Sequence, residues 1–139
     1  MIYIRRLRFK AILFGVLADT VGTLTVAAAL SLAMAEAGFP EAEITARLRG
    51  FSGLLLMLIL GLSFTLIGGY VAGRAAGQVE MLHGAIVAGI GLAPGLLFHE
   101  PGLPLWYEII SFAAMIPSGM AGGFFAREAN MKRNLPEHP

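Results

Sequence analysis

Asp19 is the residue whose type and place point most directly to chemistry. It interrupts an apolar run that extends from about residue 11 to residue 35. An aspartate inside a membrane helix costs about 2.5–3.5 kcal/mol on insertion scales, so something must offset that cost. We expect either a buried ion pair with Arg74, or hydrogen bonds to hydroxyls such as those of Thr20 and Thr23. The third alternative is a site that binds an ion or a proton.

Three further polar residues lie close together in the sequence. Arg74 and His83 flank a short turn, and Glu80 lies between them. The simplest interpretation is a solvated turn whose charges face lipid headgroups. The alternative is a polar cluster that includes Asp19, the only set of groups here that could serve a membrane-embedded enzyme. We therefore take Asp19, Arg74 and His83 as candidate ligand-binding or ion-binding residues.

Other chemistry is poorly represented. The chain has no cysteine, which excludes disulfides, thiolate catalysis and thiolate metal sites. It contains no nucleophile elbow, no phosphate-binding loop and no HExxH zinc motif. His99 and Glu100 are adjacent rather than one helical turn apart, so we assign them to a turn. We expect no enzyme activity, no cofactor and no metal site, and the net charge of +1 does not suggest nucleic acid.

Four apolar stretches must position these side chains. Apolar residues make up 57% of the chain and charged residues 14%, with 18 glycines, which is typical of membrane helices. A hydrocarbon core of about 30 Å needs about 20 helical residues, and no run shows the alternation of a membrane strand. We predict an all-α, four-helix transmembrane bundle that forms one domain over residues 1–139. The spans are expected near 11–35, 52–73, 82–98 and 105–126, with a kink if Pro94 lies within the third.

The basic residues gather on alternate sides of these spans. Eight of the ten fall on one side and two on the other. Cytoplasmic flanks retain Lys and Arg, so both termini are expected in the cytoplasm of a bacterial cell, with the protein in its inner membrane. The eight are Arg5, Arg6, Arg8, Lys10, Arg74, Arg127, Lys132 and Arg133, and the two are Arg47 and Arg49.

The first span has a second interpretation. Ala33-Met34-Ala35 follows a basic start and an apolar run, as at the cleavage site of a secretory signal peptide. The apolar region of such a peptide is about 7–15 residues long, whereas this run is longer and contains Asp19. We expect a retained helix.

The segment 38–49, between the first two spans, is expected to form a short helix at the outer surface. Pro40 suits its first turn, acidic residues follow, and basic residues close it. Ile44 and Leu48 share one face. They either dip into the membrane interface or belong to a capped extension that runs into the second span.

Small residues recur at helical spacing in the last three spans. Because lipid supplies little hydrophobic drive between helices, close backbone approach through small residues must supply the association energy. We expect packing within one subunit, and contact between copies in a homo-oligomer is the alternative. The glycines assigned to helix packing are Gly61, Gly69, Gly73, Gly77, Gly84, Gly91, Gly122 and Gly123.

Two short motifs echo one another. The second span ends with GGYVA at 68–72 and the fourth with GGFFA at 122–126, and an arginine follows each within two residues. This echo suggests two parallel helical hairpins related by an axis along the membrane normal.

The first of these motifs also carries a resemblance. GGYVAGR at 68–74, with LHGA at 82–85, resembles a signature of small bacterial four-helix membrane proteins of unknown function. In that group, G-G-Y-x-A-G/A-R ends the second helix and H-G-A begins the third. The specific part of the resemblance covers about 66–89, and it implies a multi-pass inner-membrane protein without implying an activity.

As to function, the short loops favour a structural or accessory membrane protein that contacts the lipid bilayer. Its partner would be a second copy or another membrane protein. The alternative is a small transporter or channel subunit in which Asp19 binds an ion or a proton and the glycine stripes line moving contacts. A water-filled path to Asp19 would favour transport, and a sealed bundle would favour the accessory role.

Overall fold

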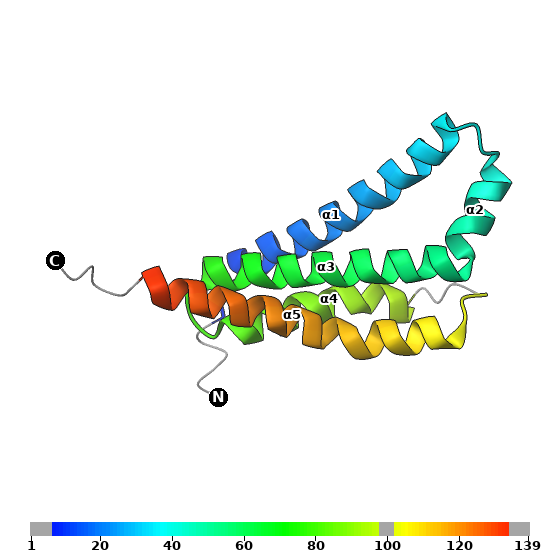
Figure 1. Ribbon diagram of the computed structural model, residues 1–139. Helices are drawn as coiled ribbons and strands as arrows, with labels where there is room; N and C mark the ends of the chain where they lie inside the picture. The colour runs from blue at the N-terminus through cyan, green and yellow to red at the C-terminus, as the bar shows by residue number, and fades with distance from the viewer. Residues whose placement is uncertain (1–6, 98–101, 134–139) are drawn as a thin grey trace.

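The structure is a computed structural model that describes residues 7–97 and 102–133. Within these ranges the chain forms five α-helices and no strand, which confirms the predicted all-α class. Figure 1 shows their arrangement. The helices are α1 (Phe9–Glu36), α2 (Glu41–Arg49), α3 (Phe51–Ala76), α4 (Glu80–Leu97) and α5 (Leu105–Arg133).

Four of these helices, α1, α3, α4 and α5, are long and apolar enough to cross a membrane. They coincide with the four predicted spans, so the predicted layout is confirmed. The helices outlast the apolar stretches: α5 continues past residue 126 to Arg133, because its polar last turns still satisfy the helical hydrogen bonds. Residue 98, the predicted end of the third span, lies outside the described residues. The chain therefore has the architecture of a multi-pass membrane protein.

Large apolar side chains point outward from the bundle. On α1, Leu13 and Phe14 are each 56% exposed, and Leu17 is 48% exposed. The buried apolar core is small by comparison and centres on Ile12, Ala72 and Val87. Lipid is the solvent that such a surface requires, because water would oppose the exposure of these side chains.

The two ends of the bundle differ. At one end, here called the basic end, α1 begins, α3 ends, α4 begins and α5 ends. At the other, the α2 end, α2 passes from the end of α1 to the start of α3 (Figure 1). α1 lies against α3 near the basic end and diverges from it toward the α2 end. Within the described ranges, no Cα atom of α1 comes within 8 Å of one in α5.

α2 is a helix of its own. The extended backbone of Gly50, with φ −70° and ψ 164°, separates it from α3, so it is not an uninterrupted extension of the second span. Ile44 is only 9% exposed and packs within the protein, which contradicts the idea that it dips into lipid. Arg47 and Glu43 form an exposed ion pair at 2.9 Å.

The predicted symmetry between two hairpins is not reflected in the packing. Exchanging the hairpins would superpose the α3–α4 contact on an α5–α1 contact, and only the first exists in the described chain. The echoed glycines also differ. Gly68 packs on the backbone of Gly15 in α1, whereas Gly122 packs on the backbone of Leu66 in α3.

Candidate ligand-binding cavity at Asp19

Asp19 is held by α3. It lies about ten residues into α1, or about 15 Å along the helix axis, and is 6% exposed. The hydroxyl of Thr65 donates a hydrogen bond to its Oδ1 at 3.3 Å. The expectation of a hydroxyl partner is thus right in kind, but the hydroxyl comes from the neighbouring helix. Thr20 and Thr23 instead line the cavity beside it.

The predicted ion pair between Asp19 and Arg74 is wrong. Arg74 lies about nine residues beyond Thr65, which places it about 13 Å closer to the basic end. Its Nη1 donates to Oδ1 of Asn130 in α5 at 2.6 Å. Asp19 therefore keeps its charge away from the basic residues at that end of the bundle.

The second carboxylate oxygen of Asp19 faces α4. A Cβ atom placed on Gly91 would lie 3.2 Å from Oδ2. Among the described residues, no group donates a hydrogen bond to Oδ2. A carboxylate at this depth has one partner where it can accept several, so it can bind a further donor or a cation.

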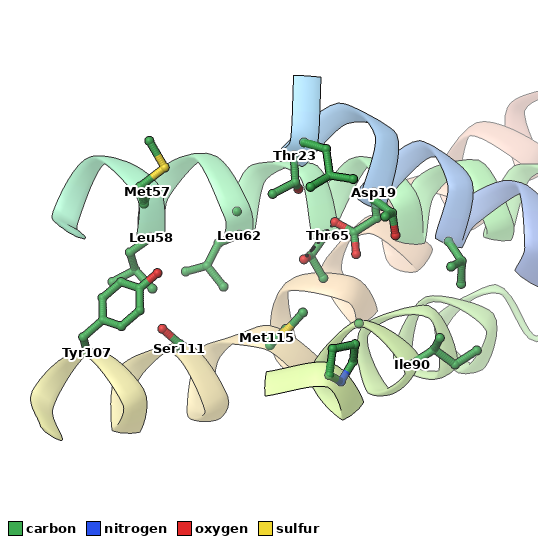
Figure 2. Close-up of a pocket in the computed structure, with 16 residues that line it drawn as sticks. Asp19, Thr23, Met57, Leu58, Leu62, Thr65, Ile90, Tyr107, Ser111 and Met115 are labelled. Atoms are coloured by element: carbon green, nitrogen blue, oxygen red, sulfur yellow. Dashed lines mark hydrogen bonds between the residues drawn. The ribbon is translucent and has the colours of Figure 1, made fainter. Parts of the chain in front are cut away.

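A cavity of about 570 Å³ lies beside this carboxylate, and its walls come from α1, α3, α4 and α5. Figure 2 shows Asp19 and Thr65 at one end of it, with Tyr107 and Ser111 approaching from α5. Most of the wall is apolar, with methionine sulfurs from Met57 and Met115. No Lys, Arg or His belongs to it. The cavity therefore carries one formal negative charge and no formal positive charge.

Ser111 is the second unsatisfied group. Its Oγ is buried and has no hydrogen-bond partner in the part of the chain that the structure describes. A buried hydroxyl without a partner costs about 1–3 kcal/mol by mutational measures. This hydroxyl would gain a partner if a polar ligand entered the cavity.

Pro94 removes one more helical hydrogen bond from the wall. It lies inside α4, as the sequence allowed, and has no backbone N–H. The carbonyl of Ile90, one turn earlier, therefore lacks its usual helical donor. Both residues line the cavity, so this side of it is short of donors rather than of acceptors.

Three of the glycines assigned to helix packing do something else. Gly61 lines the cavity, and nothing lies within 4 Å of the position that its Cβ would take. Gly91 lines the same cavity and faces Met115 and Asp19. Gly77 ends α3 in the left-handed conformation, with φ 65°, and contacts no other helix.

The remaining glycines are interhelical contacts near the basic end. At each of them an added Cβ would meet a neighbouring helix, and at most of them it would meet backbone. These contacts lie inside the subunit, so the stripes are used for packing within one chain rather than between copies. The contacts are Gly69 and Gly84 on Gly119, Gly73 on Ala126, Gly122 on Leu66 and Tyr70, and Gly123 on Glu80 and Met81.

Asn130 organises the charged groups at the basic end. Its carbonyl oxygen accepts from Arg74, and its amide nitrogen donates to Oε1 of Glu80 at 3.1 Å and to the carbonyl of Gly73 at 3.3 Å. The amide thus points its negative end at a cation and its positive end at an anion. This bridge joins α3, α4 and α5, and Asp19 takes no part in it.

His83 is fully buried and has two partners of its own. Its Nε2 accepts a hydrogen bond from the backbone N–H of Arg8 at 3.0 Å. Because that backbone group can only donate, the proton of a neutral ring is on Nδ1, which lies 3.1 Å from the carbonyl of Val79. His83 ties the start of α1 to α4, so the structure does not bring Asp19, Arg74 and His83 together as one site.

Sequence reasoning missed Asn130 and Ser111. Asn130 follows Ala126 by one turn and so continues the small-residue stripe of the last span, a signal that was available beyond the assumed end of the span. Ser111 lies on an apolar helix with no special spacing, and no sequence signal distinguishes it. His99 and Glu100 lie outside the described residues. Within the described ranges, no group of three or more His, Cys, Asp or Glu side chains gathers.

Comparison of the chain with protein-family models, with curated proteins and with solved structures found no match.

Proposed function

We propose that this chain is a small multi-pass protein of the bacterial cytoplasmic membrane that binds a positively charged ligand at Asp19, as a transporter or channel subunit would. One observation carries the proposal: a buried carboxylate with an unbonded oxygen faces a cavity that contains no Lys, Arg or His. Intramembrane acids are rare because of their cost, and they commonly mark ion or substrate pathways. The cavity reaching Asp19 favours this function over a sealed bundle.

The orientation is part of the proposal. The basic end would lie in the cytoplasm, because six of the described Lys and Arg residues are at the ends of helices there and two are in α2. Asp19 would then lie near the middle of the membrane. The cavity would extend from it toward the outer leaflet, where Tyr107 and Met57 line its far part.

Charge-selective cysteine labelling tests the cavity. The chain has no cysteine of its own, so Gly61→Cys places a single thiol in the cavity wall, where an added Cβ meets no atom. We expect the cationic reagent trimethylammonium-ethyl methanethiosulfonate to label it faster than the anionic sulfonatoethyl reagent. Adding Asp19→Asn should remove most of this preference, because the attraction comes from the carboxylate.

Ile59→Cys is the matched control. It lies on the same helix, is 55% exposed toward lipid, and is not in the cavity wall. Neither charged reagent should label it appreciably. Equal labelling of Gly61→Cys by both reagents, or no labelling at all, would overturn the proposed cation site. Labelling of intact cells by external reagent tests the orientation, since a requirement for permeabilised cells would reverse it.

A structural or accessory role is the second candidate. It is favoured by the short connections between described helices, such as the single residue Gly50 between α2 and α3, which leave no room there for a soluble domain. Purification from native membranes tests it. A stoichiometric membrane-protein partner, together with charge-independent labelling of Gly61→Cys, would favour this role over ligand binding.

A further inference from the structure

We propose that the ligand of the Asp19 cavity is a lipophilic organic monocation, such as an ammonium or phosphonium centre that carries an apolar body. This inference rests on the proposed cation site and names the class of ligand that the site accepts. It is argued from the size of the cavity, from the division of its wall, and from the gap between two helices.

Size argues against a bare inorganic ion. A volume of about 570 Å³ lies within the range of about 300–1,000 Å³ that small-molecule pockets occupy. A divalent cation held in an oxygen cage has six or more ligands at about 2.0–2.6 Å. In the described part of the chain, no cluster of acidic or histidine side chains forms such a cage. A single carboxylate in a roomy apolar cavity instead suits one charged centre with substituents around it.

The division of the wall supplies the second argument. The charge lies at one end of the cavity, where Thr65 holds one oxygen of Asp19 and leaves the other without a hydrogen bond. The walls away from it are mostly apolar, with Leu58, Met57 and Met115. Thioethers are polarizable and adapt to irregular ligand shapes. A molecule that fits this wall has one positive end and an apolar remainder.

Ser111 adds an independent sign of a ligand. Its buried Oγ lacks a partner among the described residues, although it lines a cavity that could supply one. It lies on α5, in the helix that faces α1 across the cavity. A ligand that carries a polar substituent in addition to its charge would satisfy this hydroxyl.

The gap between α1 and α5 gives such a molecule a route. The Cα atoms of these helices stay more than 8 Å apart in the described chain, although both helices line the cavity. Thr20 and Leu24 of α1 are exposed residues in the cavity wall, so the wall reaches the outer face of the bundle. An amphipathic cation concentrates at a membrane surface and could therefore enter from the bilayer between these two helices.

Equilibrium binding to the full chain in phosphatidylcholine nanodiscs tests the proposal. The probe is tetraphenylphosphonium, and triphenylphosphine oxide is its uncharged counterpart. We expect saturable binding of tetraphenylphosphonium that Asp19→Asn weakens by about ten- to a hundredfold, as expected for the loss of one partly buried charge interaction. Binding of the oxide should not change between the two proteins. Glu36→Gln, which removes an exposed carboxylate from the end of α1, should leave both affinities unchanged.

A second variant protects the test if Asp19→Asn does not fold. Gly61→Phe keeps the carboxylate but fills part of the cavity, and its Cβ meets no atom. It should abolish tetraphenylphosphonium binding, because the apolar body no longer fits. Unchanged binding in Gly61→Phe, or equal binding by wild type and a folded Asp19→Asn protein, would overturn the inference.

Inorganic cations separate this inference from the proposed function. If sodium or potassium protects Gly61→Cys from the cationic reagent in an Asp19-dependent manner while tetraphenylphosphonium neither binds nor protects, the organic ligand is wrong and the cation site stands. If the labelling of Gly61→Cys is indifferent to charge and tetraphenylphosphonium does not bind, both proposals fail.

Discussion

The part of the bundle near the basic end and the part toward the α2 end are built from the same helices, yet they pack in opposite ways. On α3, Gly69 lies against the backbone of Gly119, whereas Gly61, two turns earlier, has no atom within 4 Å of its Cβ position. The same residue type at the same helical spacing therefore makes a contact in one region and leaves space in the other. A stripe of small residues indicates which face of a helix is smooth, but not whether another helix lies against it.

Polar groups follow the same division. Near the basic end they are joined to one another, as where Asn130 bridges Arg74 and Glu80. Toward the α2 end, Asp19 has a single hydrogen bond and Ser111 has none among the described residues. Since lipid gives little hydrophobic drive to close a gap between helices, helices that part are not pulled back together. We infer that the basic end provides most of the stability and that the open region is available for a ligand.

The largest effect should come from testing the two glycines of α3 against each other. Gly69→Ala pushes a methyl group into the backbone of Gly119 and should lower the free energy of unfolding by about 2–3 kcal/mol, since the backbone cannot move aside cheaply. Gly61→Ala should change it by less than about 0.5 kcal/mol, because the methyl group enters empty space. Unfolding by SDS in mixed micelles measures both. Equal losses would break the comparison between the two regions.

The next effect concerns the polar network. Asn130→Ala leaves Arg74 and Glu80 without their shared partner and should cost about 1–2 kcal/mol, because buried charged groups lose hydrogen bonds. Glu128→Ala, an exposed residue two positions earlier on α5, is the control and should have little effect. Thermal unfolding in detergent compares them. If the two variants behave alike, the network is not a source of stability.

A smaller loss is expected at Asp19. Thr65→Val keeps the shape of the side chain but removes the hydroxyl donor, and side-chain hydrogen bonds within membrane proteins average about 0.6 kcal/mol. Thr25→Val, at an exposed position on α1, should be neutral. The same unfolding assay applies. A loss above about 2 kcal/mol in Thr65→Val would mean that Asp19 is mainly a structural group.

The smallest effect should have the opposite sign. Ser111→Ala removes a buried hydroxyl that has no partner among the described residues, so it should raise stability by a few tenths of a kcal/mol up to about 1 kcal/mol. Ser118→Ala provides the contrast, because the hydroxyl of Ser118 donates to the carbonyl of Leu62 at 2.7 Å and its loss should lower stability. A loss of equal size in both variants would show that Ser111 has a partner of its own.

The four long helices were predictable because apolar length is a local property of the sequence. Gly69, Gly84 and Gly122 were assigned to packing for a sound reason, since only small residues allow backbones to touch. The same reasoning could not distinguish Gly61 or Gly91, because whether a neighbouring helix is present depends on how α1 diverges. That divergence is a tertiary property to which no single segment testifies.

The partners of the polar residues were harder to predict for a related reason. Asp19 is an expensive residue in a membrane helix and is therefore noticeable in a sequence, but Thr65 and Arg74 were both plausible partners. The difference between them is a vertical offset of about 13 Å along α3, which follows from where each helix begins relative to its neighbours. Asn130 was missed because the last span was assumed to end at residue 126, before the helix does.

α2 sets a dimension that the transmembrane segments themselves do not. Its nine residues extend about 13 Å, which exceeds the 8–10 Å axis separation of two helices in direct contact. Joining α1 to α3 through such a spacer keeps their α2 ends apart by construction, so the width of the membrane-facing doorway is encoded in a surface connection (Figure 1). Shortening that connection by one turn would be a way to resize the doorway without altering any residue that a ligand touches.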